Sequence, residues 1–127
     1  MPSATYTLID QFTATTASSG FSFLAIPQTY TDLRLLISSQ NGGTIYVYPN
    51  NDSTGNKSRT NLYVNAATSN GSSGGASGNS GIYIDGGDAA NYPGIATVDF
   101  MSYSQTDKYK PISWRWANGN STATTNG

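Results

Sequence analysis

The sequence predicts an all-β fold, and two features of its composition and one of its patterning carry that prediction. Glutamate is absent and Ser, Thr, Asn, Gly and Tyr are abundant, so the residues that favour helices are scarce. Charged residues make up 10% of the chain, against about 25% in an average domain. Short apolar segments alternate with polar residues at the period of a strand and are separated by Gly, Asn and Pro.

The segment 21–39 has the strongest apolar pattern and is expected to organise the fold. Its first half predicts a strand over 21–26, which ends at Pro27 because proline cannot donate a hydrogen bond to a ladder. Its second half alternates apolar and other residues, so it predicts a central strand over 33–38 with one buried face.

A turn signal follows this central strand. Asn41-Gly42-Gly43 accepts positive φ angles at little cost, so we expect the strand over 33–38 to form a hairpin with a strand over 44–48. The sequence predicts further strands over residues 5–12 (an edge strand), 60–64, 82–84, 94–103 and 112–117.

The chain of 127 residues is the size of one domain. We expect a single domain over 1–117 with a flexible Gly/Ser-rich loop at 65–81, because this segment contains almost no apolar side chain. The loop is either ordered against a neighbouring subunit or a mobile surface loop. Residues 118–127 are polar and are expected to form a C-terminal tail.

The composition argues against several classes of function. A net charge of −1 with scattered bases does not suit nucleic-acid binding. No apolar run approaches the ~20 residues that span a membrane, and the N-terminus does not have the pattern of a signal peptide. Without His, Cys or Glu, and with no evident pair among the seven aspartates, no catalytic site is expected.

Two loops raise the question of a bound cation. The segment 49–58 resembles the first half of a calcium loop of the EF-hand type at Asn50, Asp52, Thr54 and Gly55, but it lacks the glutamate that ends such a loop. Asp85 and Asp88 flank two glycines and could chelate a metal. An ordinary turn is the preferred interpretation of both loops, so no cofactor is expected.

Asp99 is unusual because it lies on a mostly apolar face of the strand over 94–103. It either faces solvent or pairs with a base such as Arg115.

Aromatic residues are the candidate contact residues. Tyrosines lie opposite the more aliphatic face of their strands, and two tryptophans project from one side of the last strand. These rings would pack in the core or a subunit interface, or would stack on a glycan. The candidate interface or glycan-contact residues are Tyr46, Tyr48, Tyr63, Tyr83, Trp114 and Trp116.

The chain resembles a group of small virion proteins of marine tailed bacteriophages. Residues 5–38 match their start, with the pattern F-x-x-IP-x-TYTDL-x-L-x-x-S at 23–38. The most specific part is Ile26 to Leu35, and YVYPNNDSTGN and Lys110-Pro111-Ile112-Ser113 also fit. The resemblance implies an antiparallel, jelly-roll-like β-sandwich without enzymatic activity. Similar proteins continue past the tryptophan strand, so we expect the sandwich to be shortened at its C-terminus or completed by a neighbouring chain.

The resemblance and the composition together lead to two expected functions. The first is a structural protein of the virion, made in the host cytoplasm, that decorates or cements the capsid. Its partners would be other copies of itself and the major capsid protein or fibre subunits. The alternative is an adhesin module of a tail fibre or spike that binds host surface glycans. A carbohydrate-binding module of a secreted enzyme is a weaker third possibility, because no signal peptide is evident.

Overall fold

The computed structural model describes residues 6–16, 20–40, 45–51, 58–65, 68–76, 81–84, 93–107 and 110–118. Within these ranges the chain forms seven strands and one short 3-10 helix, and no α-helix. The strands are β1 (Leu33–Gln40), β2 (Ile45–Val47), β3 (Ser58–Asn65), β4 (Thr68–Ala76), β5 (Ile82–Ile84), β6 (Pro93–Phe100) and β7 (Ile112–Asn118). The helix η1 spans Pro49–Asn51. The predicted all-β class is therefore confirmed.

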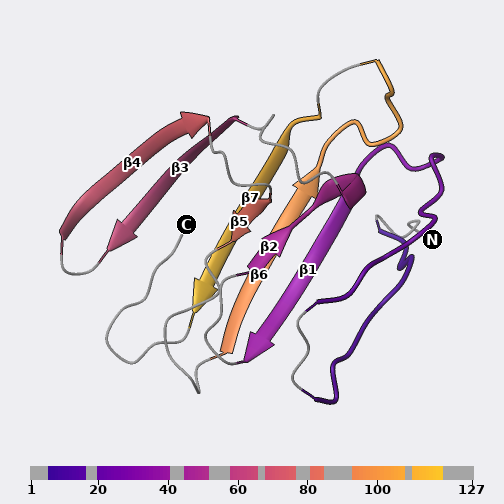
Figure 1. The fold of residues 1–127 in the computed structure, drawn as a ribbon, viewed down its shortest axis with the longest axis horizontal. Coiled ribbons are helices and arrows are strands. Elements are labelled where there is room, and N and C mark those ends of the chain that lie inside the picture. The colour runs from indigo at the N-terminus through magenta and orange to yellow at the C-terminus, as the bar shows by residue number, and fades with distance from the viewer. Residues whose placement is uncertain are drawn as a thin grey trace, which may run out of the picture.

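The principal sheet has three antiparallel strands, with β6 in the centre and β1 and β7 on its two sides (Figure 1). Its register places Val98 of β6 opposite Leu35 of β1 and opposite Trp114 of β7. Side chains two residues apart point to the same face of a strand. The face of the sheet that contains these three residues is therefore apolar along all three strands, and we call it the inner face.

The core lies on this inner face. Ala96 and Val98 of β6 and Ile82 of β5 are buried, and Val98 is fully enclosed. The short antiparallel ribbon of β2 and β5 adds Ile45 and Val47 to the same cluster. In Figure 1 this ribbon overlaps the principal sheet, with β5 drawn next to β7 and β2 over β6. The two pieces of sheet therefore share one small core.

Strands β3 and β4 form a third antiparallel pair, drawn at the left of Figure 1 beyond β7. Strand β4 falls inside the segment 65–81, so the expectation of a loop does not hold for residues 68–76. Glycine and serine have low strand propensity, but their backbone groups complete a ladder as well as those of other residues. In the register of this pair, Tyr63 is opposite Gly71 and Leu62 is opposite Ser72.

The predicted hairpin between 33–38 and 44–48 is wrong. Strand β1 pairs with β6, and β2 pairs with β5. Strand β2 has only three residues, whereas β6 offers eight residues with a complementary apolar face. The turn residues 41–44 lie outside the described residues.

The predicted strands over 5–12 and 21–26 are also wrong, because the described residues 6–16 and 20–32 belong to no strand. Ala25 has a φ of 56°, which is the left-handed region and ends an extended segment. Every residue from 6 to 16 is exposed, so this segment gains little from burial. We call residues 6–16 the N-terminal arm.

The remaining strands were predicted to within a few residues at each end. Strand β5 has the predicted bounds, and β7 is one residue longer than predicted. Strand β6 ends at Phe100, before the predicted Tyr103, because residues 101–104 form a turn. The single domain over 1–117 remains a prediction, as does the tail, since residues 119–127 lie outside the described residues.

Candidate interaction surfaces

Tyr46 and Tyr48 form an exposed aromatic pair on the side of β2 that faces away from the core. Ile45 and Val47 point to the core, and the alternation of the strand directs the two tyrosines the other way. Tyr46 is 41% exposed and Tyr48 is 42% exposed. Their ring centroids are 6.3 Å apart and the rings are tilted by 35°. The pair offers an aromatic surface to a partner.

A glycine allows the backbone to approach this pair closely. A Cβ atom at Gly81 would lie 3.0 Å from Cε1 and Cζ of Tyr48 and 3.1 Å from Cβ of Tyr46. Such distances are too short for carbon atoms in contact. Gly81 is buried, and its backbone packs directly against the Tyr48 ring. The sequence signal for this role was a glycine immediately before β5, which we assigned to the Gly/Ser-rich loop.

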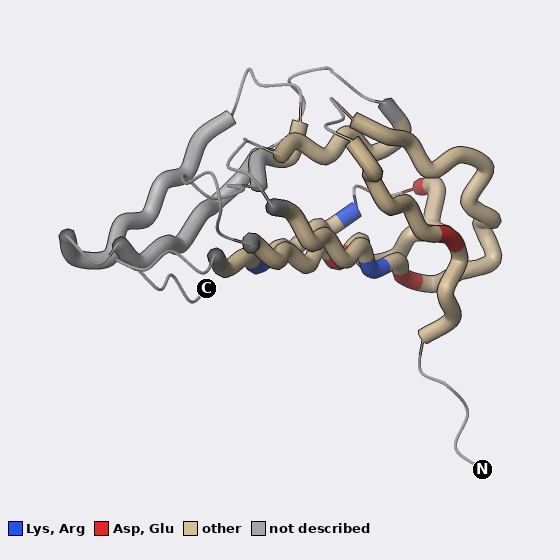
Figure 2. Tube along the Cα trace, turned by 90° about the horizontal axis from the view of Figure 1, so that it is seen from below, with Lys and Arg blue, Asp and Glu red and all other residues tan. Residues whose placement is uncertain are grey.

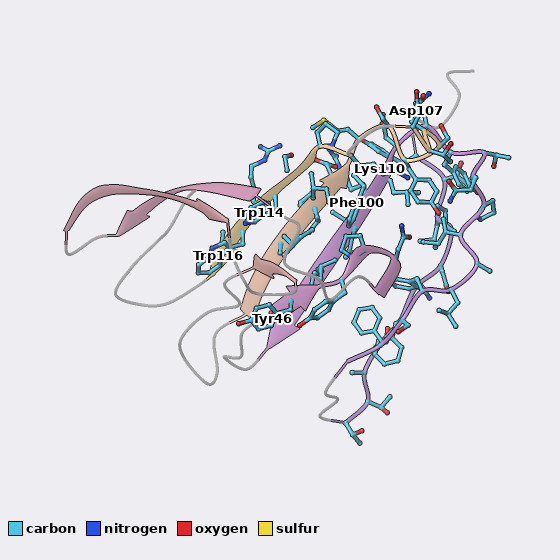
Figure 3. The ribbon with its side chains drawn as sticks, turned by 45° about the horizontal axis from the view of Figure 1, so that its top comes forward. Tyr46, Phe100, Asp107, Lys110, Trp114 and Trp116 are labelled. Atoms are coloured by element: carbon cyan, nitrogen blue, oxygen red, sulfur yellow. The ribbon has the colours of Figure 1, made fainter. Side chains whose placement is uncertain are left out.

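The two tryptophans belong to the core. Trp114 and Trp116 are half-buried and pack against the buried cluster from β7 (Figure 3). This location favours the core interpretation over a glycan platform. The other two predicted contact residues lie in strands: Tyr63 in β3 and Tyr83 in β5, where Tyr83 is the Cα partner of Tyr46. The side chains of Tyr63 and Tyr83 lie outside what the structure describes.

Three phenylalanines form an aromatic cluster between the N-terminal arm and the next segment. Phe12 and Phe21 are stacked, with ring centroids 4.7 Å apart and planes at 19°. Phe21 meets the edge of Phe23 at 5.2 Å. Both rings of the stacked pair remain 49% exposed, and the adjacent Leu24 is 82% exposed. This cluster therefore holds the arm in place while leaving apolar surface uncovered.

The face of the β1–β6–β7 sheet opposite the core, which we call the outer face, also carries apolar side chains. It consists of Arg34, Leu36, Ser38, Ile95, Thr97, Asp99, Ser113, Arg115 and Ala117. Leu36 is 70% exposed and Ile95 is 63% exposed. Since Leu36 is opposite Thr97 and Ile95 is opposite Ser38, Leu36 and Ile95 are diagonal neighbours on adjacent strands.

An ion pair lies at one end of the outer face. Nε of Arg34 donates to Oδ1 of Asp99 at 2.6 Å, and Nη2 donates to Oδ2 at 3.1 Å. The hydrogen bond from Arg34 lowers the pKa of Asp99, and the charges of Arg34 and Arg115 lower it further. Of the two alternatives weighed for Asp99, pairing with a base is confirmed, but the base is Arg34. The ring of Tyr6 in the N-terminal arm covers this guanidinium at 4.9 Å.

The residues of the motif at 23–38 have structural roles in the described contacts. Oδ1 of Asp32 accepts a hydrogen bond from the backbone N–H of Ser102 at 2.7 Å. The hydroxyl of Tyr103 donates to the carbonyl oxygen of Ile26 at 3.0 Å, and the Lys110 ammonium donates to the carbonyl oxygen of Tyr103. The first two bonds join the loop before β1 to the β6–β7 connection, and the third lies within this connection, whose Lys110 and Asp107 are labelled in Figure 3. The described contacts of the motif therefore stabilise the fold.

The described residues give no support to a metal site. They contain no group of three or more acidic residues that could hold a metal ion. Asp52, Thr54 and Gly55 of the calcium alternative and Asp85 and Asp88 of the other lie outside the described residues. Among the helices in the described part of the chain, none is long and apolar enough to cross a membrane.

Three comparisons with known proteins complete the description of the chain. No model of a protein family, no curated protein and no solved structure matches it.

Proposed function

We propose that this chain is a non-enzymatic structural protein of a tailed bacteriophage virion, and that it decorates or cements the capsid. The observation that carries the proposal is the distribution of apolar side chains. Among the described residues, eleven large apolar side chains are exposed, whereas only three apolar residues are buried. Contiguous exposed apolar surface, as at the stacked rings of Phe12 and Phe21, is typical of a subunit that is covered in an assembly.

The charge of the chain supports the same proposal. Figure 2 shows how few positions of the described chain are charged, and the net charge is −1. Repulsion between neighbouring copies would therefore be small when many copies are placed close together on a lattice. The virion is suggested by the resemblance at Ile26–Leu35, and this location after synthesis in the host cytoplasm belongs to the proposal.

The proposal includes a finer description of the fold. The β1–β6–β7 sheet and the β2–β5 ribbon would be the two layers of a jelly-roll-like β-sandwich. The second layer has only two short strands in the described residues, so a neighbouring chain would complete it. Its contacts with other copies and with the major capsid protein would then stabilise the particle by burying apolar area.

The test is the location and copy number of the chain in purified particles. Quantitative mass spectrometry should give a copy number that is related to the icosahedral symmetry of the head, and gold-labelled antibodies should mark the head. A few copies located only at the tail would contradict capsid decoration.

A second experiment tests whether the apolar surface makes the attachment. Purified chain should bind to capsids that lack it, and Phe21→Ser with Leu24→Ser should weaken this binding. Thr29→Ser, a change at another exposed position of the same segment, is the matched control and should bind normally. Equal binding by all variants would show that this apolar surface does not contribute to the attachment.

The alternative function is an adhesin module of a tail fibre or spike, and the exposed pair of Tyr46 and Tyr48 is the observation that favours it. Two tilted rings at 6.3 Å suit stacking against the faces of a sugar. A glycan array should then show binding that Tyr46→Ala and Tyr48→Ala abolish and that Tyr6→Ala, at another exposed ring, leaves intact. If no glycan binds, or if the three variants bind alike, the adhesin function is excluded.

A further inference from the structure

We propose that the outer face of the β1–β6–β7 sheet is a self-association surface, on which a second copy of this chain packs sheet against sheet. The inference deepens the proposed function, because it names one of the subunit contacts on which that function rests.

Two exposed aliphatic residues are neighbours on the outer face. A sheet face that remains in water normally carries polar side chains. Here Leu36 and Ile95 protrude as diagonal neighbours from adjacent strands. Their direct neighbours across the ladders, Ser38 and Thr97, have short side chains. A second sheet can therefore approach to the ~10 Å spacing of packed sheets and cover both aliphatic residues.

The exposed area of the outer face and the N-terminal arm also favours a dimer. The N-terminal arm extends the apolar surface beside β1, where Tyr6 lies over Arg34. Figure 2 shows the first described residues projecting beyond the body of the molecule. The four residues concerned are Tyr6 at 62%, Leu8 at 75%, Leu36 at 70% and Ile95 at 63% exposure. At about 200 Å² for a fully exposed residue of this size, they expose about 540 Å² per copy. If this surface were fully covered, two copies would bury about 1,100 Å², close to the lower limit of ~1,000 Å² for a specific interface, so the expected dimer is weak and concentration-dependent.

The distribution of charge selects the orientation of the second copy. Arg34 is neutralised by Asp99, whereas Arg115 adds a positive charge on the β7 side. The first 33 residues contain no Lys or Arg, and Asp10 is the one charged residue of the arm over 6–16. A two-fold axis parallel to the strands places β7 of one copy over β1 and the arm of the other. Each Arg115 then lies on the side of the second copy's arm, whose one charged residue is Asp10, while an arrangement with β7 over β7 would bring two Arg115 side chains together.

The test is the oligomeric state of the full chain, measured by sedimentation velocity over a range of concentrations. We expect a concentration-dependent dimer. Leu36→Ser with Ile95→Ser should shift it to monomer, with an unchanged far-UV circular dichroism spectrum. Leu24→Ser removes a more exposed leucine outside this face and should leave the dimer intact.

A charge-reversal pair gives an independent readout that does not alter the apolar residues. Asp10→Arg and Arg115→Asp should each raise the dimer dissociation constant by about tenfold, and the double variant should restore it. A wild-type chain that is monomeric at all concentrations would overturn the inference, as would an oligomer that neither set of variants weakens. If such a monomer still binds capsids, the proposed function stands without this contact.

Discussion

Arg34 and Asp99 are directly opposed Cα partners on β1 and β6, and their side chains are joined by two hydrogen bonds of 2.6 and 3.1 Å. A shift of one residue between these strands would move the carboxylate to the apolar inner face. The pair therefore favours one register of the principal sheet. It also leads to a prediction about acid stability.

The Arg34–Asp99 pair should make stability depend on pH. The hydrogen bond from Arg34 lowers the pKa of Asp99 in the folded chain, so the unfolded chain binds this proton more readily. The resulting stabilisation is complete above the unfolded pKa of about 3.9 and is lost as the pH falls through the lower, folded value.

Urea unfolding at a series of pH values tests this prediction. Asp99→Asn should be less stable than wild type at neutral pH, and the difference should shrink below about pH 4. Asp107→Asn removes another exposed carboxylate, and its stability should vary with pH near 4 as that of wild type does. A constant difference between wild type and Asp99→Asn at all pH values would contradict the prediction.

Tyr103→Phe should destabilise the connection between β6 and β7. The change removes the hydroxyl that donates to the carbonyl oxygen of Ile26, and a hydrogen bond of this kind contributes about 1 kcal/mol. We expect the free energy of unfolding to fall by about this amount in urea titrations. Tyr30→Phe removes a hydroxyl from the neighbouring loop and should cost less. An equal loss for the two variants would show that the bond to Ile26 has no special role.

Gly81→Ala should disturb the exposed tyrosine pair. The new methyl group would lie 3.0 Å from the Tyr48 ring, so the ring must move or the backbone must shift, at a cost of about 1–3 kcal/mol. The near-UV circular dichroism of tyrosine should change together with the unfolding free energy. A Cβ atom at Gly20 would meet nothing within 4 Å, so Gly20→Ala is the control and should have little effect. An unperturbed spectrum for Gly81→Ala would disprove the close approach.

Ala25→Gly should stabilise the chain. Ala25 has a φ of 56°, and this conformation destabilises a residue with a Cβ atom by about 1–2 kcal/mol. Glycine removes this strain but loses more entropy on folding, so a net gain of up to about 1 kcal/mol is expected. Ala117→Gly, within strand β7, should instead destabilise by about 0.5–1 kcal/mol. Thermal unfolding of both variants measures the difference, and a loss of stability in Ala25→Gly would refute the strained conformation.

The sequence predicted most strands but not how they pair. Alternating residues in β1 and β7 reveal their positions, because a half-buried strand needs apolar side chains at every second place. Pairing depends on complementary faces that lie far apart in the chain. The turn signal at 41–43 suggested a local hairpin, whereas β1 pairs with β6 and its apolar face lies beside Val98 and Ala96. Turn-forming residues indicate only which local hairpin is possible, so they could not show that β1 pairs with the distant β6.

The candidate surfaces were predicted in part. The alternation around Tyr46 and Tyr48 correctly indicated that these rings point away from the aliphatic side of β2, and their exposure follows from that. The alternation of β1 already indicated that Leu36 shares a face with Arg34 and Ser38, opposite the apolar face of the strand. The sequence did not show the register, which places Leu36 opposite Thr97 and makes Ile95 its diagonal neighbour. A single-strand pattern cannot distinguish a second buried face from an uncovered one.

The pairing of β1 with β6 also has a consequence for synthesis on the ribosome. Gln40 at the end of β1 is paired with Pro93 at the start of β6, so about 50 residues must be translated before the ladder can begin. At about 5–20 residues per second this delay lasts several seconds. During that time the apolar side chains of β1 have emerged without their partner strand. The nascent chain is therefore expected to need a chaperone that shields β1 until β6 and β7 follow, and its folding yield should rise when translation is faster.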